Sequence, residues 1–333
     1  MSSNPKPPVL VWGPMGFLGQ HLIARLLEEG VEVSVLCRSR SLYPTPVWAP
    51  HVRWFELDRP GSLESNLLAA VSHASVVYNF AGSSGAVASM RQPQHSLDEN
   101  CRAQLAFLGA CEKSGHRPHV VFPSSWLVYA AGGAAPLHEN HPTGPLSVYA
   151  AHKICIEHYL GIYAAQGCIT YAVCRISNPY GFDDPVRMGK GYKILNAFIQ
   201  LALAKKPVVI FGDGKQLRDF IYIDDLIEAM LACGLNVEAR NQIFNISSGQ
   251  SHSLIQALET LVELAGAFPV VFKPWPAEYR AVEPGDYIAD ISKAADLLRF
   301  HPRYDLKSGL EETILDYRSA PSANLSLAEG AGD

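Results

Sequence analysis

The sequence lacks several features that define other classes of protein. No apolar run approaches the ~18 residues that a membrane-spanning helix needs. Residues 1–8 lack the basic-then-apolar layout of a secretory signal. The 27 Lys and Arg residues do not exceed the 32 Asp and Glu residues, so a net charge of −5 offers no basic surface to nucleic acid or an anionic membrane. We therefore expect a cytoplasmic protein that binds neither.

Cysteine pairs and metal-ligand spacings are also missing. The seven cysteines are scattered, and none forms a C-x-x-C pair. Their odd number indicates free thiols in a reducing compartment. The 12 histidines show no ligand spacing either, so we expect no metal site.

Strand-length apolar runs alternate with helical patterns through the first half of the chain. The expected strands are 8–12, 31–37, 52–57, 76–80, 119–122 and 170–176, and the expected helices are 17–29, 62–71, 97–113 and 148–165. This alternation predicts an α/β fold of the Rossmann type, with a doubly wound parallel sheet.

The rhythm changes after residue 177. Proline- and glycine-rich stretches separate shorter elements there, with helices expected at 192–204 and 226–233. We assign residues 1–177, with a return segment near 219–250, to the sheet domain. Residues 178–218 and 251–318 would form a smaller C-terminal lobe over the carboxyl edge of the sheet, where such folds bind ligands. Residues 319–333 are small, polar and aperiodic, which predicts a disordered tail.

A glycine-rich turn joins the first expected strand to the first expected helix. It reads Gly13-Pro-Met-Gly16-Phe17-Leu18-Gly19, with the spacing G-x-x-G-x-x-G. Glycines permit the tight turn and let the backbone approach a pyrophosphate, which then lies at the helix N-terminus. A plain strand–helix turn could carry the same pattern, but its position between strand and helix favours a dinucleotide site.

Arginines stand at the end of the second expected strand, where NAD enzymes commonly place an acid that binds the ribose. This chain has Arg38 and Arg40 instead. An acid repels a 2′-phosphate, whereas arginine can pair with it, so the sequence favours NADP(H) over NAD(H). The alternative is that both are solvated loop charges. Asp58, after the third strand, is a candidate partner for the adenine, although a surface cap would look the same.

Tyr149 and Lys153 share one face of the expected helix 148–165, because positions i and i+4 are neighbours there. A nearby cation stabilises phenolate and lowers the pKa of a tyrosine, which suits proton transfer at a hydroxyl. Alone, the two residues could be a surface pair. Ser125, after strand 119–122, could hydrogen-bond the same reacting oxygen or merely cap the strand. The glycine turn, the serine and the Tyr/Lys pair, in this order, predict a catalytic site.

These motifs resemble those of the extended short-chain dehydrogenases, specifically the nucleotide-sugar epimerases, dehydratases and reductases of the UDP-glucose 4-epimerase type. The resemblance covers roughly residues 8–318. It implies that Ser125, Tyr149 and Lys153 are catalytic and that Lys153 also holds the cofactor ribose. It implies further cofactor contacts beyond the glycine turn, from Asn79, Ala81, Gly82 and Asn100.

The segment 212–226, GDGKQLRDFIYIDDL, matches the family most specifically. In the family its arginine, here Arg218, grips the diphosphate of the sugar nucleotide. A structural bridge to a nearby acid is the alternative. The resemblance also implies that Asn178 borders the nucleotide-sugar site, that Ser125 contacts the sugar, and that Arg280 is a second phosphate ligand.

One departure narrows the activity. Trp126-Leu127 stands where 4,6-dehydratases of the family carry an Asp-Glu pair, which disfavours a dehydratase. The resemblance therefore implies an NAD(P)-dependent epimerase, acting at C4 of a nucleotide sugar through a transient 4-keto intermediate. The alternatives are an NADPH-dependent reductase of a 4-keto sugar nucleotide and a non-catalytic NADP-binding protein.

The resemblance also implies a homodimer. In the family, two helices of each subunit form a four-helix interface, and they correspond to 97–113 and 148–165 here. The side chains expected between subunits are Leu105, Leu108, Ile156 and Leu160.

Overall fold

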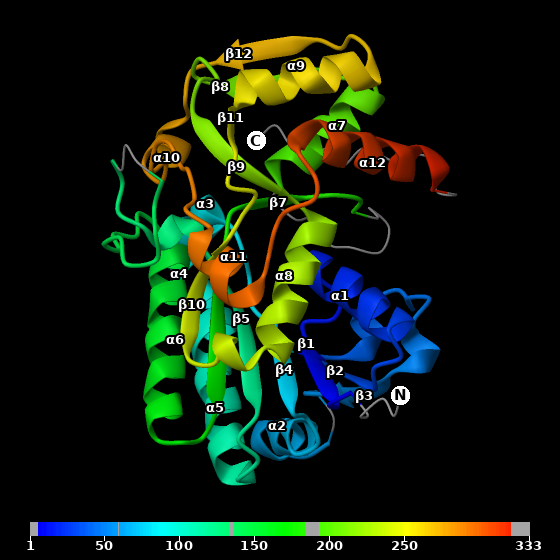
Figure 1. Cartoon of the computed structure of the whole chain (residues 1–333), viewed down its shortest axis with the longest axis vertical. Coiled ribbons are helices and arrows are strands. Elements are labelled where there is room, and N and C mark those ends of the chain that lie inside the picture. The colour runs from blue at the N-terminus through cyan, green and yellow to red at the C-terminus, as the bar shows by residue number, and fades with distance from the viewer. Residues whose placement is uncertain (1–5, 59, 133–135, 184–192, 321–333) are drawn as a thin grey trace.

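The main sheet has seven parallel strands that wind outward from its centre. The computed structural model describes residues 6–58, 60–132, 136–183 and 193–320. The strand order is β10-β6-β5-β4-β1-β2-β3 (Figure 1). From β1 the chain adds β2 and β3 on one side, and then β4, β5, β6 and β10 on the other side. The strands are β1 (Val9–Trp12), β2 (Val33–Cys37), β3 (Arg53–Glu56), β4 (Val76–Asn79), β5 (His119–Ser125), β6 (Thr170–Ile176) and β10 (Gln242–Ile246). The predicted doubly wound Rossmann-type sheet is confirmed.

Helices cover both faces of this sheet. One face carries α1 (Phe17–Glu28) and α8 (Ile223–Leu235), and the other carries α2 (Leu63–Val71), α5 (Ala103–Ser114) and α6 (Val148–Ala165). Val9 and Val11 belong to the first core, whereas Leu10 and Trp12 belong to the second. Successive strand residues point to opposite faces, so a strand buried on both faces reads as a continuous apolar run.

A second group of elements lies over one end of the main sheet, at the top of Figure 1. Its small sheets have the orders β11-β9-β7 and β12-β8. The strands are β7 (Asn178–Tyr180), β8 (Val208–Phe211), β9 (Leu217–Tyr222), β11 (Ser251–Ser253) and β12 (Val270–Lys273). The helices are α7 (Ile194–Leu203), α9 (Leu254–Ala265), α10 (Ala277–Arg280) and α12 (Leu306–Ser319), while α11 (Ser292–Leu298) packs against α8 and β10.

Most expected elements differ from the structure by one or two residues at an end, and three differ by more. The helix expected at 97–113 is divided into α4 (Pro93–Leu97), a π-helical turn η3 (Asp98–Arg102) and α5, and the short helix α3 (Ala86–Arg91) precedes them. Strand β5 continues to Ser125, because its last residues pair with β6 despite their low strand propensity. Helix α8 begins at Ile223 rather than at residue 226.

The C-terminal part of the chain also ends differently from the expectation. Ser319 closes α12 and is therefore not the start of a tail. The remainder of the expected tail, 321–333, lies outside the described residues, as does residue 192 of the helix expected at 192–204. Within the described parts of the chain, no helix combines the length and apolar character needed to cross a membrane.

Candidate active site

The glycine turn forms a cradle at the N-terminus of α1. Gly13 has φ +86°, and a Cβ there would lie 2.8 Å from the Phe80 carbonyl carbon. A Cβ on Gly19 would lie 2.4 Å from the Gly13 carbonyl oxygen. Gly16 is the N-cap residue and supplies no side-chain cap to the helix that begins with Phe17 and Leu18. Backbone N–H groups at such an uncapped helix start suit a pyrophosphate, so the residues present fit a dinucleotide.

The loop after β4 packs against this turn. The buried Asn79 amide donates to Gln104 Oε1 over 2.6 Å, and Gln104 Nε2 donates to the Ala81 carbonyl over 3.3 Å. A Cβ on Gly82, which has φ +129°, would lie 2.4 Å from Asn100 Oδ1. Asn79, Ala81, Gly82 and Asn100 therefore lie close together, beside the glycine turn. Their contact with a cofactor stays a prediction.

Both arginines after β2 have partners within the protein. Arg38 forms an ion pair with Glu99 of η3, and the Arg40 guanidinium carbon lies 4.7 Å from the Trp54 ring centroid. Exposed Asp58 donates its backbone N–H to the Arg38 carbonyl over 2.9 Å. A 2′-phosphate that binds Arg38 would have to compete with the Glu99 carboxylate.

The structure brings the three predicted catalytic residues together. Ser125 ends β5, and Tyr149 and Lys153 lie one turn apart on α6, which Ser147 caps through the Ala150 N–H over 3.2 Å. The Ser125 hydroxyl lies near the Tyr149 phenol and acts to lower its pKa. Lys153 Nζ lies 5.5 Å from the centroid of the Tyr149 ring. A hydroxyl, a phenol and an ammonium group thus converge where β5 meets α6.

The expected lowering of the Tyr149 pKa by Lys153 is wrong for this arrangement. Burial raises the pKa of Tyr149 to about 12, and the nearby Ser125 hydroxyl opposes this only in part. Burial lowers the pKa of Lys153 to about 8, and the negative charge of Glu157 is the largest influence that opposes this. Lys153 Nζ donates to the Pro123 carbonyl over 2.7 Å, so its charge is directed to β5 rather than to the phenol oxygen.

Arg218, from the most family-specific segment, is buried on β9 and already engaged. Its Nη1 donates to the Leu217 and Gly285 carbonyls, each over 2.8 Å, and its Nη2 pairs with Glu283. The guanidinium carbon lies 5.2 Å from the ring of Trp126, which directly follows Ser125. The structural bridge that the sequence left open therefore exists, and it lies beside Trp126, the neighbour of Ser125.

The other two predicted substrate ligands lie in different surroundings. Asn178 begins β7 and donates its Nδ2 to the Asp219 carbonyl over 3.0 Å, which ties β7 to β9 next to Arg218. Arg280 ends α10, and its side chain is exposed. Their role in substrate binding stays a prediction.

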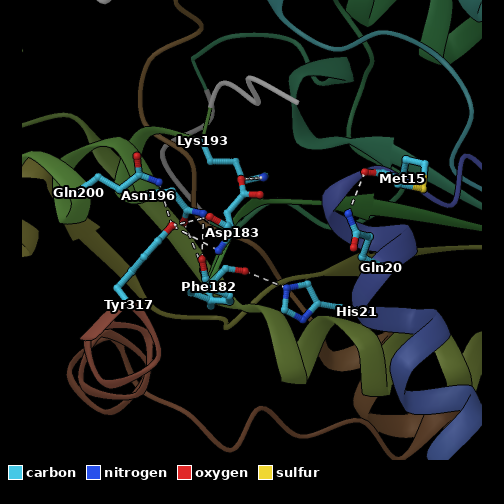
Figure 2. Close-up of polar contacts among 10 residues, drawn as sticks. Met15, Gln20, His21, Phe182, Asp183, Lys193, Asn196, Gln200 and Tyr317 are labelled. Carbon is cyan, nitrogen blue, oxygen red and sulfur yellow. Dashed lines mark hydrogen bonds and ion pairs between the residues drawn. The ribbon is translucent and has the colours of Figure 1, made fainter. Parts of the chain in front are cut away.

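A polar contact that the sequence did not predict ties α1 to the second group of elements (Figure 2). His21 Nε2 lies 2.9 Å from the Phe182 carbonyl, and burial lowers the pKa of His21. Lys193 pairs with Asp183 (Figure 2). Its Nζ also lies 3.6 Å from the Phe17 ring centroid. The helix that begins at the dinucleotide cradle is thereby held against the part of the chain that carries β7 and α7.

The fold and this site together define a class, the dinucleotide-dependent enzymes of the extended short-chain dehydrogenase type. The family model for the NAD dependent epimerase/dehydratase family matches residues 9–247. The chain belongs to this family, which confirms the resemblance seen in the sequence.

Curated relatives match along nearly the whole chain. A protein named putative UDP-glucose 4-epimerase from Methanocaldococcus jannaschii is 28% identical, with 92% of this chain and 97% of that protein covered. The UDP-glucose 4-epimerase of Azospirillum brasilense is 26% identical, with 98% and 96% covered.

Solved structures agree with these relatives. The UDP-glucose 4-epimerase of Thermotoga maritima with UDP-glucose has a TM-score of 0.81 and 27% identity, with 93% of this chain and 98% of that chain covered. The UDP-glucuronic acid 4-epimerase of Bacillus cereus, in complex with UDP-glucuronic acid and NAD, has a TM-score of 0.78 and 26% identity, with 92% and 98% covered.

Proposed function

We propose that this chain is a nucleotide-sugar 4-epimerase that uses a tightly held nicotinamide cofactor and acts on a UDP-sugar. The observation that carries the proposal is the meeting of Ser125, Tyr149 and Lys153 at the same carboxyl edge of the sheet as the dinucleotide cradle. The solved relatives with UDP-glucose, and with UDP-glucuronic acid and NAD, support the substrate class and the cofactor.

In this proposal, the phenol of Tyr149 takes the proton of the sugar 4-OH and later returns it. The Ser125 hydroxyl holds the same oxygen, and Lys153 holds the cofactor ribose and stabilises phenolate once it turns from the Pro123 carbonyl. A bound nicotinamide cofactor would accept hydride from C4 and give it back to the opposite face. The Arg218 guanidinium would release the Glu283 carboxylate and bind the substrate diphosphate instead.

The second part of the chain supplies the substrate side in this proposal. Because β9 (Leu217–Tyr222) pairs with β7 and β11, the boundary expected at residue 219 moves to 223. Residues 178–222 and 251–318 would form the nucleotide-sugar-binding lobe, and residues 1–177 with 223–250 the NAD(P)-binding domain. The cytoplasmic location stays a prediction from the sequence.

Incubation of the purified protein with a panel of UDP-sugars, with and without added NADPH, tests the function. We expect the C4 epimer of one substrate to accumulate to an equilibrium ratio without net consumption of cofactor. The panel includes a UDP-4-keto-sugar, whose C4 carbonyl can accept hydride. Stoichiometric oxidation of NADPH with that substrate would instead indicate the 4-keto reductase, which the arginine pair at residues 38 and 40 favours. Binding without any turnover would indicate a non-catalytic protein.

Cofactor preference gives a separate prediction. We propose that Arg38 and Arg40 favour NADP(H) over NAD(H), and that Glu99 opposes this by occupying Arg38. Glu99→Gln should therefore raise NADP(H) affinity relative to NAD(H) by about tenfold, and Arg38→Ala should lower it, since one charge-assisted contact contributes about 1.5–3 kcal/mol. Titration calorimetry with both cofactors measures the ratio. Equal or tighter NAD(H) binding by the wild type would contradict the preference, and an unchanged ratio in Glu99→Gln would contradict the role of Glu99.

Assembly as a homodimer is also a proposal, with a correction to its contact residues. Leu108, Ile156 and Leu160 pack inside the monomer and are about 1% exposed each, because they face the sheet. Leu105 (39%) is exposed on α5, and Ile162 (52%) is exposed on α6. We expect light scattering to give a dimer mass for the wild type and a monomer mass for Ile162→Glu. Leu315→Glu, at an exposed position (53%) of α12, is the matched control and should remain dimeric. A monomeric wild type across a wide concentration range would contradict the proposal.

A further inference from the structure

Glu157 occupies the next turn of α6 after Lys153, so Tyr149, Lys153 and Glu157 follow one another at intervals of four residues. Its side chain is 6% exposed and pairs with Arg175 of β6, whose side chain is 5% exposed. Glu157 Oε2 accepts from Arg175 Nη2 over 2.7 Å, and Oε1 accepts from Arg175 Nε over 3.2 Å. Oε1 also accepts from the hydroxyl of Ser124, the residue before Ser125.

A carboxylate buried this deeply needs a partner, and Arg175 provides it. The reaction itself gives Glu157 no part, and neither the glycine turn nor the Tyr/Lys pair predicts it. Yet the same carboxylate contacts the end of the strand that carries the catalytic serine and lies one helical turn from the catalytic lysine.

We propose that Glu157 is a positioning residue for the catalytic centre: it fixes the end of β5 through Ser124 and keeps the Lys153 ammonium charged. The inference rests on the proposed function, because it assigns a task within that active site.

The first task is geometric. Ser124 and Ser125 pair in register with Arg175 and Ile176 of β6, at the very end of β5. The Ser124 hydroxyl ties this end to α6, the helix that carries Tyr149. Arg175 is itself held, because its Nη1 donates to the Glu139 carbonyl over 2.9 Å and its guanidinium carbon lies 4.9 Å from the Tyr129 ring centroid. The support behind Ser125 is therefore rigid on both sides.

The second task is electrostatic. Lys153 is surrounded by Tyr149 and Glu157 of α6, by Cys101 of η3, and by the Phe122 ring and Pro123 carbonyl of β5. Burial lowers the pKa of Lys153 to about 8, and Glu157 is the largest opposing influence. Since the ammonium is lost as pH rises through this pKa, loss of the Glu157 charge should bring that loss to lower pH.

The test uses the full-length protein and reads the two tasks separately. NMR of Cε-labelled lysine follows the Lys153 titration without substrate, and kcat against pH follows the reaction in the cofactor-loaded enzyme. For Glu157→Gln we expect the pKa of Lys153 to fall by roughly one pH unit. The pH at which kcat declines on the alkaline side of its profile should fall by the same amount. Ser124→Ala keeps every charge, so it should lower kcat severalfold without changing the pH at which kcat declines on the alkaline side. Glu157→Asp should restore the wild-type pH profile because it restores the charge.

Removal of the carboxylate leaves Arg175 buried without its partner, which can prevent folding. The double variant Glu157→Gln with Arg175→Met removes that lone cation and should again titrate Lys153 at lower pH than the wild type, because Glu157 acts on that pKa directly. An unchanged Lys153 titration in the folded Gln variants would overturn the electrostatic task. An unchanged kcat in Ser124→Ala would overturn the geometric one. Absence of turnover in the wild type would contradict the proposed function and leave the titration result standing.

Discussion

Tyr149→Phe should abolish most turnover while the protein still folds and binds its cofactor. The change removes one oxygen from a ring that stays in place, so packing is retained. That oxygen is the proposed proton carrier, and general acid–base catalysis contributes about 10²–10⁴-fold to rate. Ser125→Ala should cost less because it removes a hydrogen bond rather than the carrier. Lys153→Met should reduce both turnover and cofactor affinity, because Lys153 is assigned both tasks.

Tyr163→Phe is the matched control for this experiment. Tyr163 lies on α6 as well, near the opposite end of the helix from the catalytic residues, so the same change there should leave kcat near the wild-type value. Circular dichroism and cofactor titration establish that both variants are folded and loaded. A folded Tyr149→Phe enzyme with close to wild-type kcat would exclude Tyr149 as the proton carrier.

Arg218→Ala should weaken UDP-sugar binding strongly and leave cofactor binding nearly intact. The proposed diphosphate contact is charge-assisted, and its loss should cost about 1.5–3 kcal/mol of binding free energy. The same change leaves the Glu283 side chain, which is 12% exposed, without its cation. We therefore also expect a lower melting temperature, since breaking a buried pair commonly destabilises by about 3–5 kcal/mol.

Glu283→Gln separates the two roles of Arg218. It breaks the bridge but keeps the guanidinium, so substrate affinity should be retained or increase if Arg218 binds the diphosphate. If Arg218 only supports the fold, Arg218→Ala and Glu283→Gln should have similar effects on stability and no specific effect on the substrate Kd. Titration of each folded variant with UDP-sugar and with cofactor decides between these outcomes.

The sequence predicted elements best where periodicity is strong and local. Helix α6 and strand β6 have the bounds that the pattern gave, 148–165 and 170–176. The end of β5 was missed because a proline and two serines have low strand propensity, and only pairing with β6 makes them a strand. The π-helical turn η3 was missed because a helical apolar pattern does not distinguish a π turn from an α turn.

The ion-pair partners of the arginines could not be predicted from the sequence, for a different reason. Arg38 pairs with Glu99, 61 residues away, and Arg218 pairs with Glu283, 65 residues away. Sequence motifs identified the arginines but not the acids that occupy them, since such partners meet only in the folded chain. The Lys153–Tyr149 spacing likewise predicted proximity correctly, but the pKa of Tyr149 depends on burial, which outweighs the effect expected from the cation.

In the proposed mechanism, hydride leaves C4 and returns to the same carbon within one active site. The most direct measurement uses a UDP-sugar that carries deuterium at C4, incubated with the cofactor-loaded protein in ordinary water. We expect both C4 epimers to form and both to retain deuterium at C4, with no loss to solvent and no net change in the oxidation state of the cofactor. Protium at C4 of the product, or cofactor consumed in proportion to product, would contradict this mechanism.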